Sequence, residues 1–469
     1  MRALYTIILV FNYIALIYMI GITLNYFFQL VFAGGNLSKY VKYLRYADYK
    51  RYINSDNMIP ISILVPAYNE AATILETAKN LLKLKYPKYE VIIINDGSKD
   101  ETLHMLQDTF QLLPIDKPYK RSIATKEVHT VYCSTLYPNL IIVDKENGGK
   151  ADALNVGINM ALYPVFVSMD ADSILEKQAL IRIITPFLTD NNVIGVGGVV
   201  RVSNGCVVED GDIKEIRLPE TALGKLQTVE YLRSFFTGRI GAAEMDMLLI
   251  ISGAFGAFRK DVVIEAGGYT TDCIGEDMEL VVKLHSMMLK AKRKYAIKFL
   301  ADPICWTQSP ESVRDLYKQR KRWQIGLINT LLRHKEMLLN PKFGKIGMLT
   351  IPFYWVFEFF GPIFETCGYI IVPISFLLGI VNLQFLLVYF LLVVVIGMIL
   401  SIGAIMMESY SLRSFPELKQ VVILVLFALL DNFGYRQFNA FIRVIGTFGY
   451  KSNKHTWGSM NREKFKGDG

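Results

Sequence analysis

Two apolar runs of strand length each end in carboxylates. Asp96 follows the run Val91–Asn95, and Asp170 and Asp172 follow the run Val165–Met169. Open α/β sheets bind nucleotides at the carboxyl ends of their strands, where Asp96 can accept hydrogen bonds from a base or a ribose. Alternate residues of an extended chain point to one side, so Asp170 and Asp172 can share a site whose hard oxygen ligands suit Mg²⁺ or Mn²⁺. The plainer interpretations are a helix N-cap and a chance pair of surface carboxylates.

A lysine follows a glycine pair between these two runs. Asn147–Asn155 reads NGGKADALN, in which the glycines let backbone approach a ligand and Lys150 offers a cation suited to a diphosphate. The spacing differs from that of a P-loop, and the hydroxyl residue is absent. Upstream, Ile61–Glu70 reads ISILVPAYNE, a buried strand followed by a polar turn that carries Tyr68. Taken singly, these segments are equally compatible with a flexible turn and an ordinary strand end.

Two helical patterns carry further polar groups. Asp277 lies in the first turn of the pattern that GEDMEL opens, where it can act as a general base or simply face the helix dipole. Gln319, Arg322 and Trp323 stand at i, i+3 and i+4 and share one helix face, which can hold a phosphate and stack on a sugar ring. The alternative is a basic amphipathic helix on a membrane surface, a role that Arg320 and Lys321 can fill from the opposite side of the helix.

Short apolar runs alternate with helical patterns from Met58 to about Leu339. This alternation predicts an α/β fold with a mostly parallel sheet and helices on both faces. We expect strands at Ile61–Val65, Val91–Asn95, Leu140–Val143, Val165–Met169, Val193–Val202, Leu249–Phe258 and Ile297–Leu300. We expect helices at Thr73–Leu84, Ala151–Met160, Glu276–Leu289 and Ser312–Leu332.

The composition indicates membrane helices on both sides of this region. Hydrophobic residues make up 52% of the chain, and the mean hydropathy is +0.30. Residues 4–32 are uncharged, and further apolar runs cover 348–380, 384–407 and 420–446. The formal charge of +8 collects beside these runs, which favours the cytoplasmic face of a membrane over nucleic acid as the partner. The five dispersed cysteines are typical of reduced thiols in a cytosolic domain.

These patterns predict five consecutive segments. They are an N-terminal transmembrane helix (1–33), a basic juxtamembrane linker (34–57), a cytoplasmic α/β domain (58–340), a C-terminal membrane region (341–450) and a basic tail (451–469). If all three C-terminal runs cross, the basic tail lies outside, against the positive-inside tendency, so the number of spans stays open. Asp431, Arg436 and Arg443 interrupt the last run, which either faces a polar path or does not simply cross.

The order of the chemical residues resembles the D, DxD, D, QxxRW series of processive family-2 glycosyltransferases. That family includes cellulose, hyaluronan, chitin-oligosaccharide and poly-N-acetylglucosamine synthases. The resemblance covers roughly residues 60–330 and extends to the flanking membrane segments. It implies the GT-A nucleotide-sugar fold and a hexosyltransferase activity. Many relatives have Thr where Gly275 stands here, so a hydroxyl near the acceptor is missing.

The resemblance also implies a role for each matching residue. The donor side would comprise Tyr68, Glu70 and Asp96 on the nucleoside, Lys150 on the diphosphate, and Asp170 and Asp172 on the nucleotide and Mg²⁺ or Mn²⁺. The acceptor side would comprise Asp277 as base, Gln319 and Arg322 positioning diphosphate and acceptor, Trp323 under the acceptor sugar, and Ser252 and Gly253 in an acceptor-side loop, Ser252–Gly256.

The implied function is processive, inverting transfer from a UDP-sugar to a growing β-linked extracellular polysaccharide that leaves through the plasma or inner membrane. An accessory membrane or export subunit is a further expected partner. The DADS run and the stretch Trp355–Pro362 favour UDP-N-acetylglucosamine, while UDP-glucose stays open. Two alternatives remain: transfer of a single sugar to a lipid-linked acceptor, and a membrane scaffold or export component whose transferase domain is dead.

Overall fold

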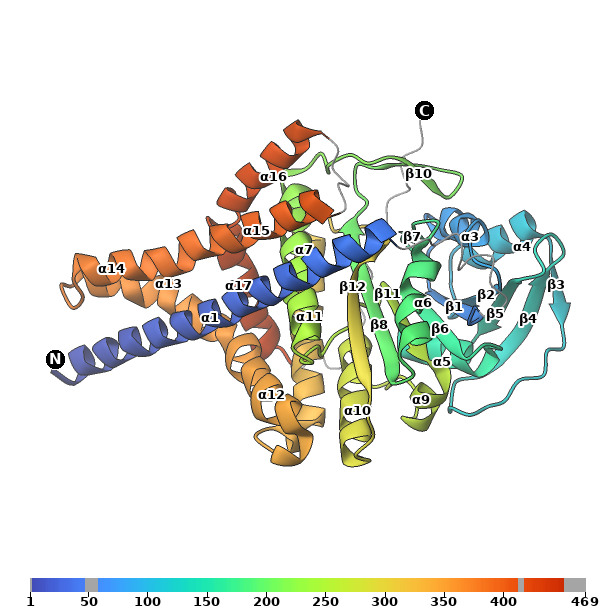
Figure 1. Cartoon of the computed structure of the whole chain (residues 1–469), viewed down its shortest axis with the longest axis horizontal. Helices are drawn as coiled ribbons and strands as arrows, with labels where there is room; N and C mark the ends of the chain where they lie inside the picture. Colours follow the sequence, from blue (N-terminus) through green and yellow to red (C-terminus); the bar gives the residue numbers. More distant parts are fainter. Residues whose placement is uncertain (1, 47–57, 412–416, 451–469) are drawn as a thin grey trace. The chain divides into compact units, whose positions relative to one another are not determined.

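The computed structural model describes residues 2–46, 58–411 and 417–450 of the 469-residue chain (Figure 1). The described residues form two compact units. The α/β unit contains residues 58–220 and Asp246–Ser309. The helical unit contains the N-terminal helix up to Val41, Thr221–Met245 and the described residues from Pro310 onward. The predicted basic tail and residues 47–57 of the predicted linker lie outside the described residues.

One large sheet organises the α/β unit. Its strands are β1 (Ile61–Ala67), β2 (Tyr89–Asn95), β3 (Leu112–Ile115), β4 (Val128–Ser134), β5 (Leu140–Lys145), β6 (Val165–Met169), β7 (Ser173–Leu175), β8 (Val193–Val202), β11 (Phe255–Arg259) and β12 (Ala296–Thr307). Within the described residues they lie in the order β3-β4-β5-β2-β1-β6-β11-β8-β12-β7. All but β4, β7 and β11 run in one direction, which confirms the expected mostly parallel sheet. A short hairpin, β9 (Val207–Glu209) and β10 (Asp212–Glu215), stands apart.

The α/β unit also contains helices that flank the sheet. They are α3 (Ile74–Leu82), α4 (Thr102–Phe110), α5 (Lys150–Met160), α6 (Ala179–Thr189), α9 (Lys260–Glu265) and α10 (Glu276–Lys290). Helix α5 packs closely on β1 and β2, because a Cβ on Gly157 would lie 3.1 Å from side-chain atoms of Leu64 and Ile94. Its Asn155 donates to the carbonyl of Tyr269 and accepts from the same residue's N–H, at 2.8 and 2.7 Å. The middle of α5 is therefore held firmly against the sheet and the segment before α10.

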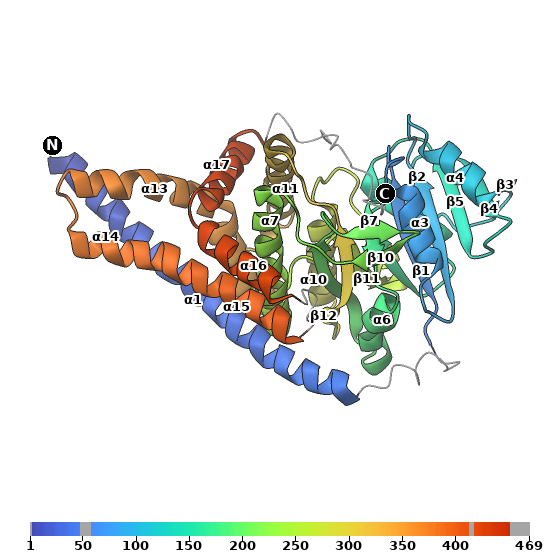
Figure 2. The same cartoon turned by 90° about the horizontal axis from the view of Figure 1, so that it is seen from above.

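The helical unit combines the N-terminal helix with segments from the middle and the C-terminal part of the described chain. Its helices are α1 (Arg2–Tyr46), α7 (Ala222–Leu232), α8 (Ile240–Glu244), α11 (Val313–Arg333), α12 (Ile351–Phe353), α13 (Gly361–Leu377), α14 (Leu383–Phe390), α15 (Ile396–Ser411), α16 (Leu418–Leu430) and α17 (Tyr435–Phe448). Helix α1 runs beside α13 and α14 in both views (Figures 1 and 2). A buried cluster joins them through Ala15 and Ile22 of α1, Val372 of α13 and Tyr389 of α14.

Several helices of this unit have the length and apolarity of membrane spans. Tyr5–Ser38 and Leu383–Tyr410 qualify alone, and two bent pairs raise the number to as many as four among the described residues. One pair, Leu418–Leu430 with Tyr435–Phe448, bends by 57°. Asp431 lies at this break and accepts from Arg233 at 2.6 Å and Arg436 at 3.0 Å. The predicted apolar helices are thus present, and the last apolar run is not one straight helix.

The structure corrects several predicted boundaries. The strand expected at Leu249–Phe258 begins only at Phe255, because the buried residues before it form an irregular segment and a turn. Strand β12 continues seven residues beyond the expected Leu300, through a register shift between Phe299 and Ile304 against β8. The elements that were not predicted are helices α4, α6, α7, α8 and α9 and strands β3, β4, β7, β9 and β10.

Candidate active site

Four of the predicted segments follow adjacent parallel strands at one edge of the sheet. Tyr68 follows β1, Asp96 follows β2, the glycine loop of residues 146–149 follows β5, and Asp170 follows β6. These strands lie side by side in the order β5-β2-β1-β6, all pointing the same way. Parallel strands deliver their carboxyl ends to a single edge, and that edge is where this class of sheet binds ligands.

The turn after β1 presents an aromatic ring. Asn69 adopts a left-handed conformation with φ 56°, which asparagine tolerates better than most residues. Its side-chain oxygen accepts from the N–H of Lys99 at 2.8 Å, and the N–H of Glu70 donates to the hydroxyl of Thr102 at 2.9 Å. The turn is thereby tied to the segment after β2, and the side chain of Tyr68 stays 44% exposed.

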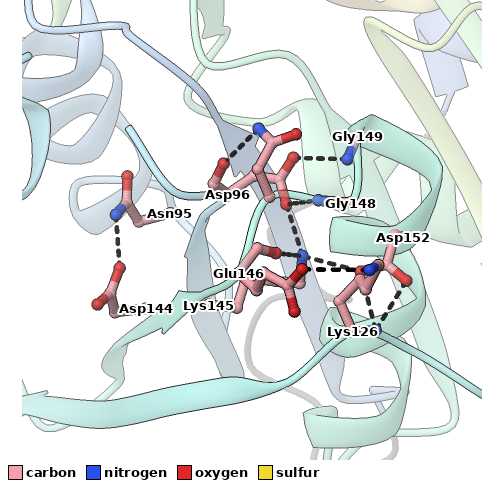
Figure 3. Close-up of polar contacts among 10 residues, drawn as sticks. Asn95, Asp96, Lys126, Asp144, Lys145, Glu146, Gly148, Gly149 and Asp152 are labelled. Atoms are coloured by element: carbon pink, nitrogen blue, oxygen red, sulfur yellow. Dashed lines mark hydrogen bonds and ion pairs between the residues drawn. The ribbon is translucent and has the colours of Figure 1, made fainter. Parts of the chain in front are cut away.

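Asp96 is buried and holds the glycine loop (Figure 3). Its Oδ1 accepts from Lys145 Nζ at 2.5 Å and from the N–H of Gly148 at 3.0 Å. Its Oδ2 accepts from the N–H of Gly149 at 2.8 Å. Asn147 donates its side-chain amide to the Asp96 carbonyl at 2.7 Å. Both carboxylate oxygens are engaged by the chain itself, so contact between Asp96 and a nucleoside stays a prediction.

Lys145 and Asp152 belong to this network, although sequence reasoning did not single them out. The Lys145 side chain is 0% exposed, and its ammonium lies 2.8 Å from Asp152 Oδ2 as well as beside Asp96. Asp152 in turn accepts from the N–H of Lys126 at 3.1 Å. The only sequence signal was that Lys145 is the last residue of an apolar strand, directly before the glycine loop.

Lys150 begins α5 immediately after the loop and lies among carboxylates. Its Nζ is 2.5 Å from Asp170 Oδ1 and 3.4 Å from Glu276 Oε1. Burial alone would lower the pKa of Lys150, but these two carboxylates outweigh burial and raise the pKa above its ordinary value. Lys150 is therefore a cation held in place at the sheet edge, and its contact with a diphosphate stays a prediction.

Asp277 faces the same place from the first turn of α10. Its Oδ2 accepts from the N–H of Gly253 at 3.1 Å, and its Oδ1 accepts from the N–H of Met278 at 2.8 Å. A Cβ on Gly253 would lie 2.7 Å from Lys150 Nζ and 3.7 Å from Asp277 Oδ2. The structure therefore brings together Lys150, Asp170, Gly253 and Asp277, which are 127 residues apart along the chain at most.

The two carboxylates after β6 do not lie on an extended strand. The Asp170 carbonyl accepts from the N–H of Ser173 at 3.2 Å, which closes a turn. The expectation that Asp170 and Asp172 point to one side of an extended chain is therefore wrong. The Asp170 side chain is 30% exposed beside Lys150, whereas Asp172 is buried and accepts from Thr307 Oγ1 at 3.2 Å. Among the described residues, no group of three or more His, Cys, Asp or Glu side chains is placed to hold a metal.

The predicted Gln319, Arg322 and Trp323 belong to α11 in the helical unit. Gln319 is buried, and its Oε1 has no hydrogen-bond partner among the described residues. Trp323 is 46% exposed, and the Arg320 guanidinium lies 4.1 Å from its ring centroid. Arg320 is itself buried and lies 2.7 Å from Glu230 Oε2, so its expected position on a membrane surface is wrong.

Family comparisons agree with this geometry. The model of Glycosyl transferase family 2 matches residues 62–267, and that of Glycosyl transferase family group 2 matches residues 165–406, just over half of the chain. The chain belongs to glycosyl transferase family 2. In this glycosyltransferase, the first match covers Asp96, Lys150 and Asp170, and the second covers Asp277 and α11.

Curated relatives include polysaccharide synthases. The glycosyltransferase is 34% identical over 322 residues to a poly-β-1,6-N-acetyl-D-glucosamine synthase of Staphylococcus aureus, covering 67% of this chain and 64% of the relative. The synthase of the same description from Staphylococcus epidermidis is 32% identical over 274 residues, covering 58% and 56%. The matches thus span less than two thirds of these relatives.

A solved structure shares the fold. A mannosyltransferase from Pyrobaculum calidifontis, in complex with GDP-Man and Mn²⁺, superposes with a TM-score of 0.50 at 18% identity. The alignment covers 90% of this glycosyltransferase and 99% of that chain. This likeness confirms the expected GT-A-like fold, a mixed but mostly parallel α/β sheet, accompanied here by long apolar helices.

Proposed function

We propose that the chain is a processive, inverting glycosyltransferase that polymerises UDP-N-acetylglucosamine into a β-linked extracellular polysaccharide. The observation that carries the proposal is the cluster of Lys150, Asp170, Gly253 and Asp277, in which a fixed cation and an oriented carboxylate face one position at the strand ends. The two staphylococcal relatives, which are named for a poly-N-acetylglucosamine product, support this choice of donor over UDP-glucose.

On the donor side, we assign the nucleoside to the turn after β1 and the diphosphate to Lys150. The exposed ring of Tyr68 offers a surface for base stacking, Glu70 lies in the same turn after β1, and Asp96 follows the adjacent strand β2. Lys150 would exchange its present contact with Asp170 for the phosphate oxygens of the donor. A cation that is already held by burial and by carboxylates needs little reorganisation when the leaving group becomes charged.

The chemistry of the carboxylates after β6 suits a divalent cation. Asp170 already binds a cationic group, and carboxylate oxygens are hard ligands. Mg²⁺ typically binds through one or two carboxylates plus substrate phosphates, so Asp170 with the donor phosphates would suffice without a complete cage of side chains. Asp172, which is buried beside Thr307, would have to turn toward Asp170 to become a second ligand. Mg²⁺ or Mn²⁺ held there would neutralise charge on the leaving diphosphate.

Asp277 would act as the general base. The amides of Gly253 and Met278 hold its carboxylate in place and leave further lone pairs on both oxygens for an acceptor hydroxyl. As Asp277 takes the hydroxyl proton, the acceptor oxygen bonds to the sugar's anomeric carbon. The bond from that carbon to the diphosphate breaks, and its electron pair leaves with the diphosphate beside Lys150. One such displacement inverts an α-linked donor into a β-linked product.

On the acceptor side, we assign Ser252 and Gly253 to the loop beside the acceptor. We assign the indole of Trp323, with Gln319 and Arg322 on the same helix, to the acceptor sugar and the diphosphate. The apolar helices would anchor the enzyme in a plasma or inner membrane as a multi-pass protein, with its α/β unit in the cytoplasm and the product leaving across the membrane. An accessory export subunit would act at that step.

The chemical step is tested by comparing Asp277→Asn with Asp261→Asn, which changes another first-turn carboxylate, on α9. We expect the first variant to bind UDP and to lose turnover by about 10²- to 10⁴-fold, the usual contribution of a general base, and the second to retain it. A near-wild-type rate for Asp277→Asn would remove Asp277 as base. NMR showing α-linkages in the product would refute inversion.

A further inference from the structure

A buried lysine sits between two buried aspartates next to the donor site. The Lys145 ammonium lies 2.5 Å from Asp96 Oδ1 and 2.8 Å from Asp152 Oδ2. The exposed fractions of the three side chains are 0%, 4% and 6% in that order. Figure 3 shows the lysine pointing between the two carboxylates, beneath the glycine loop. None of the three was assigned a chemical step by the proposed displacement.

Burying the triad of Lys145, Asp96 and Asp152 costs free energy of folding unless every charged group in it is paired. Two carboxylates held this close repel one another, and removing the cation between them would leave uncompensated buried charge. Buried ion pairs are weak contributors to stability compared with apolar packing, so a triad placed beside a site calls for another explanation. In some proteins such a group is retained because it imposes one conformation on the chain around it.

The conformation imposed here is that of the glycine loop. Asp96 accepts from the amides of Gly148 and Gly149, and Lys145 also donates to the Glu146 carbonyl. Gly148 packs so closely that a Cβ on it would lie 2.5 Å from Asp152 Oδ2. The loop is therefore tied to Asp96 at Gly148 and Gly149 and to Lys145 at Glu146.

The same triad also anchors the opposite side of the loop. Asp152 accepts from the N–H of Lys126 at 3.1 Å, and Lys126 Nζ lies 3.1 Å from Glu146 Oε1. The N–H of Glu146 donates to the carbonyl of Glu127 at 3.0 Å. The loop is thus clamped between the end of β2, the start of α5 and the segment before β4.

We propose that Lys145 is a positioning residue for the donor: by neutralising Asp96 and Asp152 it fixes the glycine loop, and with it the first residue of α5, Lys150, at the diphosphate position. This inference rests on the proposed function of the same site. Lys145 acts through Asp96 and the loop and does not touch the donor.

The test compares Lys145→Met with Lys117→Met. Lys117 is another largely buried lysine, 3.9 Å from buried Glu90, and Glu90 lies at the opposite end of the strand that Asp96 follows. We expect Lys145→Met to raise the donor KM by about tenfold or more and to lower kcat by a smaller factor, because the loop places Lys150 against a diphosphate that it meets in both the ground state and the transition state. We expect Lys117→Met to leave the donor KM unchanged.

A second variant separates charge from packing. Lys145→Met/Asp152→Asn removes one of the two carboxylates that the single variant leaves facing each other. We expect its donor KM to return at least part of the way to wild type, whereas a lysine that merely fills space would give no recovery. An unchanged donor KM in Lys145→Met would overturn the proposal. So would a loss of activity that only mirrors the loss of folded protein and that the second variant does not rescue.

Hydrogen exchange gives a readout that does not depend on turnover. In the full-length protein in detergent, the peptide that contains the amides of Gly148 and Gly149 should exchange faster in Lys145→Met than in wild type or Lys117→Met. Unchanged exchange in that peptide would contradict the positioning role. If wild type shows no UDP-sugar turnover while exchange behaves as expected, the proposed function fails and the loop-fixing role stands.

Discussion

Replacing Lys150 by methionine tests the donor site directly. Met has nearly the same length, so the change removes the ammonium and leaves most of the packing in place. The lost contacts are those to Asp170 at 2.5 Å and Glu276 at 3.4 Å, together with the diphosphate contact that we assign to this lysine. A charge-assisted hydrogen bond contributes about 1.5–3 kcal/mol, which corresponds to a loss of about 10- to 150-fold in kcat/KM.

The assay measures UDP release at varied donor concentration, with UDP binding followed separately by calorimetry. We expect the loss in kcat/KM to include weaker UDP binding, because the lysine meets the diphosphate in both the ground state and the transition state. Lys150→Arg should recover part of the activity, since it keeps the charge in a different geometry. A Lys150→Met enzyme with near-wild-type UDP affinity and kcat/KM would refute the assignment.

Three other predictions concern the acceptor-side loop, the metal and a buried histidine. Gly253→Ala should lower kcat in steady-state assays with little change in thermal stability, because its Cβ would lie 2.7 Å from the flexible end of Lys150. Chelation by EDTA should stop UDP release and Mn²⁺ should restore it; unaffected turnover would exclude the metal role given to Asp170. Burial lowers the pKa of His285 to about 4, below its ordinary 6.5, so only the unfolded state takes up this proton between those values. The contribution of neutral His285 to the free energy of unfolding should therefore be fully present above pH 6.5 and be lost as the pH drops toward 4, by about 3 kcal/mol at most. Across this range the melting temperature of wild type should fall more steeply with falling pH than that of His285→Gln.

Sequence periodicity predicted the buried centre of the fold better than its edges. The strands β1, β2, β5 and β6 are buried on both faces and read as continuous apolar runs, so their existence was predictable. Strand β12 was expected to end at Leu300, but it continues through Asp302 after a register shift that leaves no pattern of apolar residues in the sequence. Edge strand β3, with Leu113 exposed, lacks the alternation that marks a half-buried strand.

The site was predictable where one residue stood at the end of an apolar run. Asp96 and Asp170 were predictable in this way, and Asp277 was predictable from its place in the first turn of a helical pattern. The structure brings Asp170 and Asp277 near the same lysine, Lys150. Lys145 and Asp152 were missed, because a lysine and an aspartate on different elements reveal their pairing only after the sheet places them together. Asp172 was assigned to an extended segment that proved to be a turn, since a period of two cannot be tested on three residues.

Product analysis with a single donor tests most directly whether this chain is a polymerising transferase. Purified protein would be incubated with UDP-N-acetylglucosamine or UDP-glucose and Mn²⁺ or Mg²⁺, and UDP release would be followed while the product is sized. We predict metal-dependent release with UDP-N-acetylglucosamine and a β-linked product of high mass from the earliest time points. Release accompanied only by a single sugar on a lipid would contradict polymerisation, and no release with either donor would contradict the assigned activity.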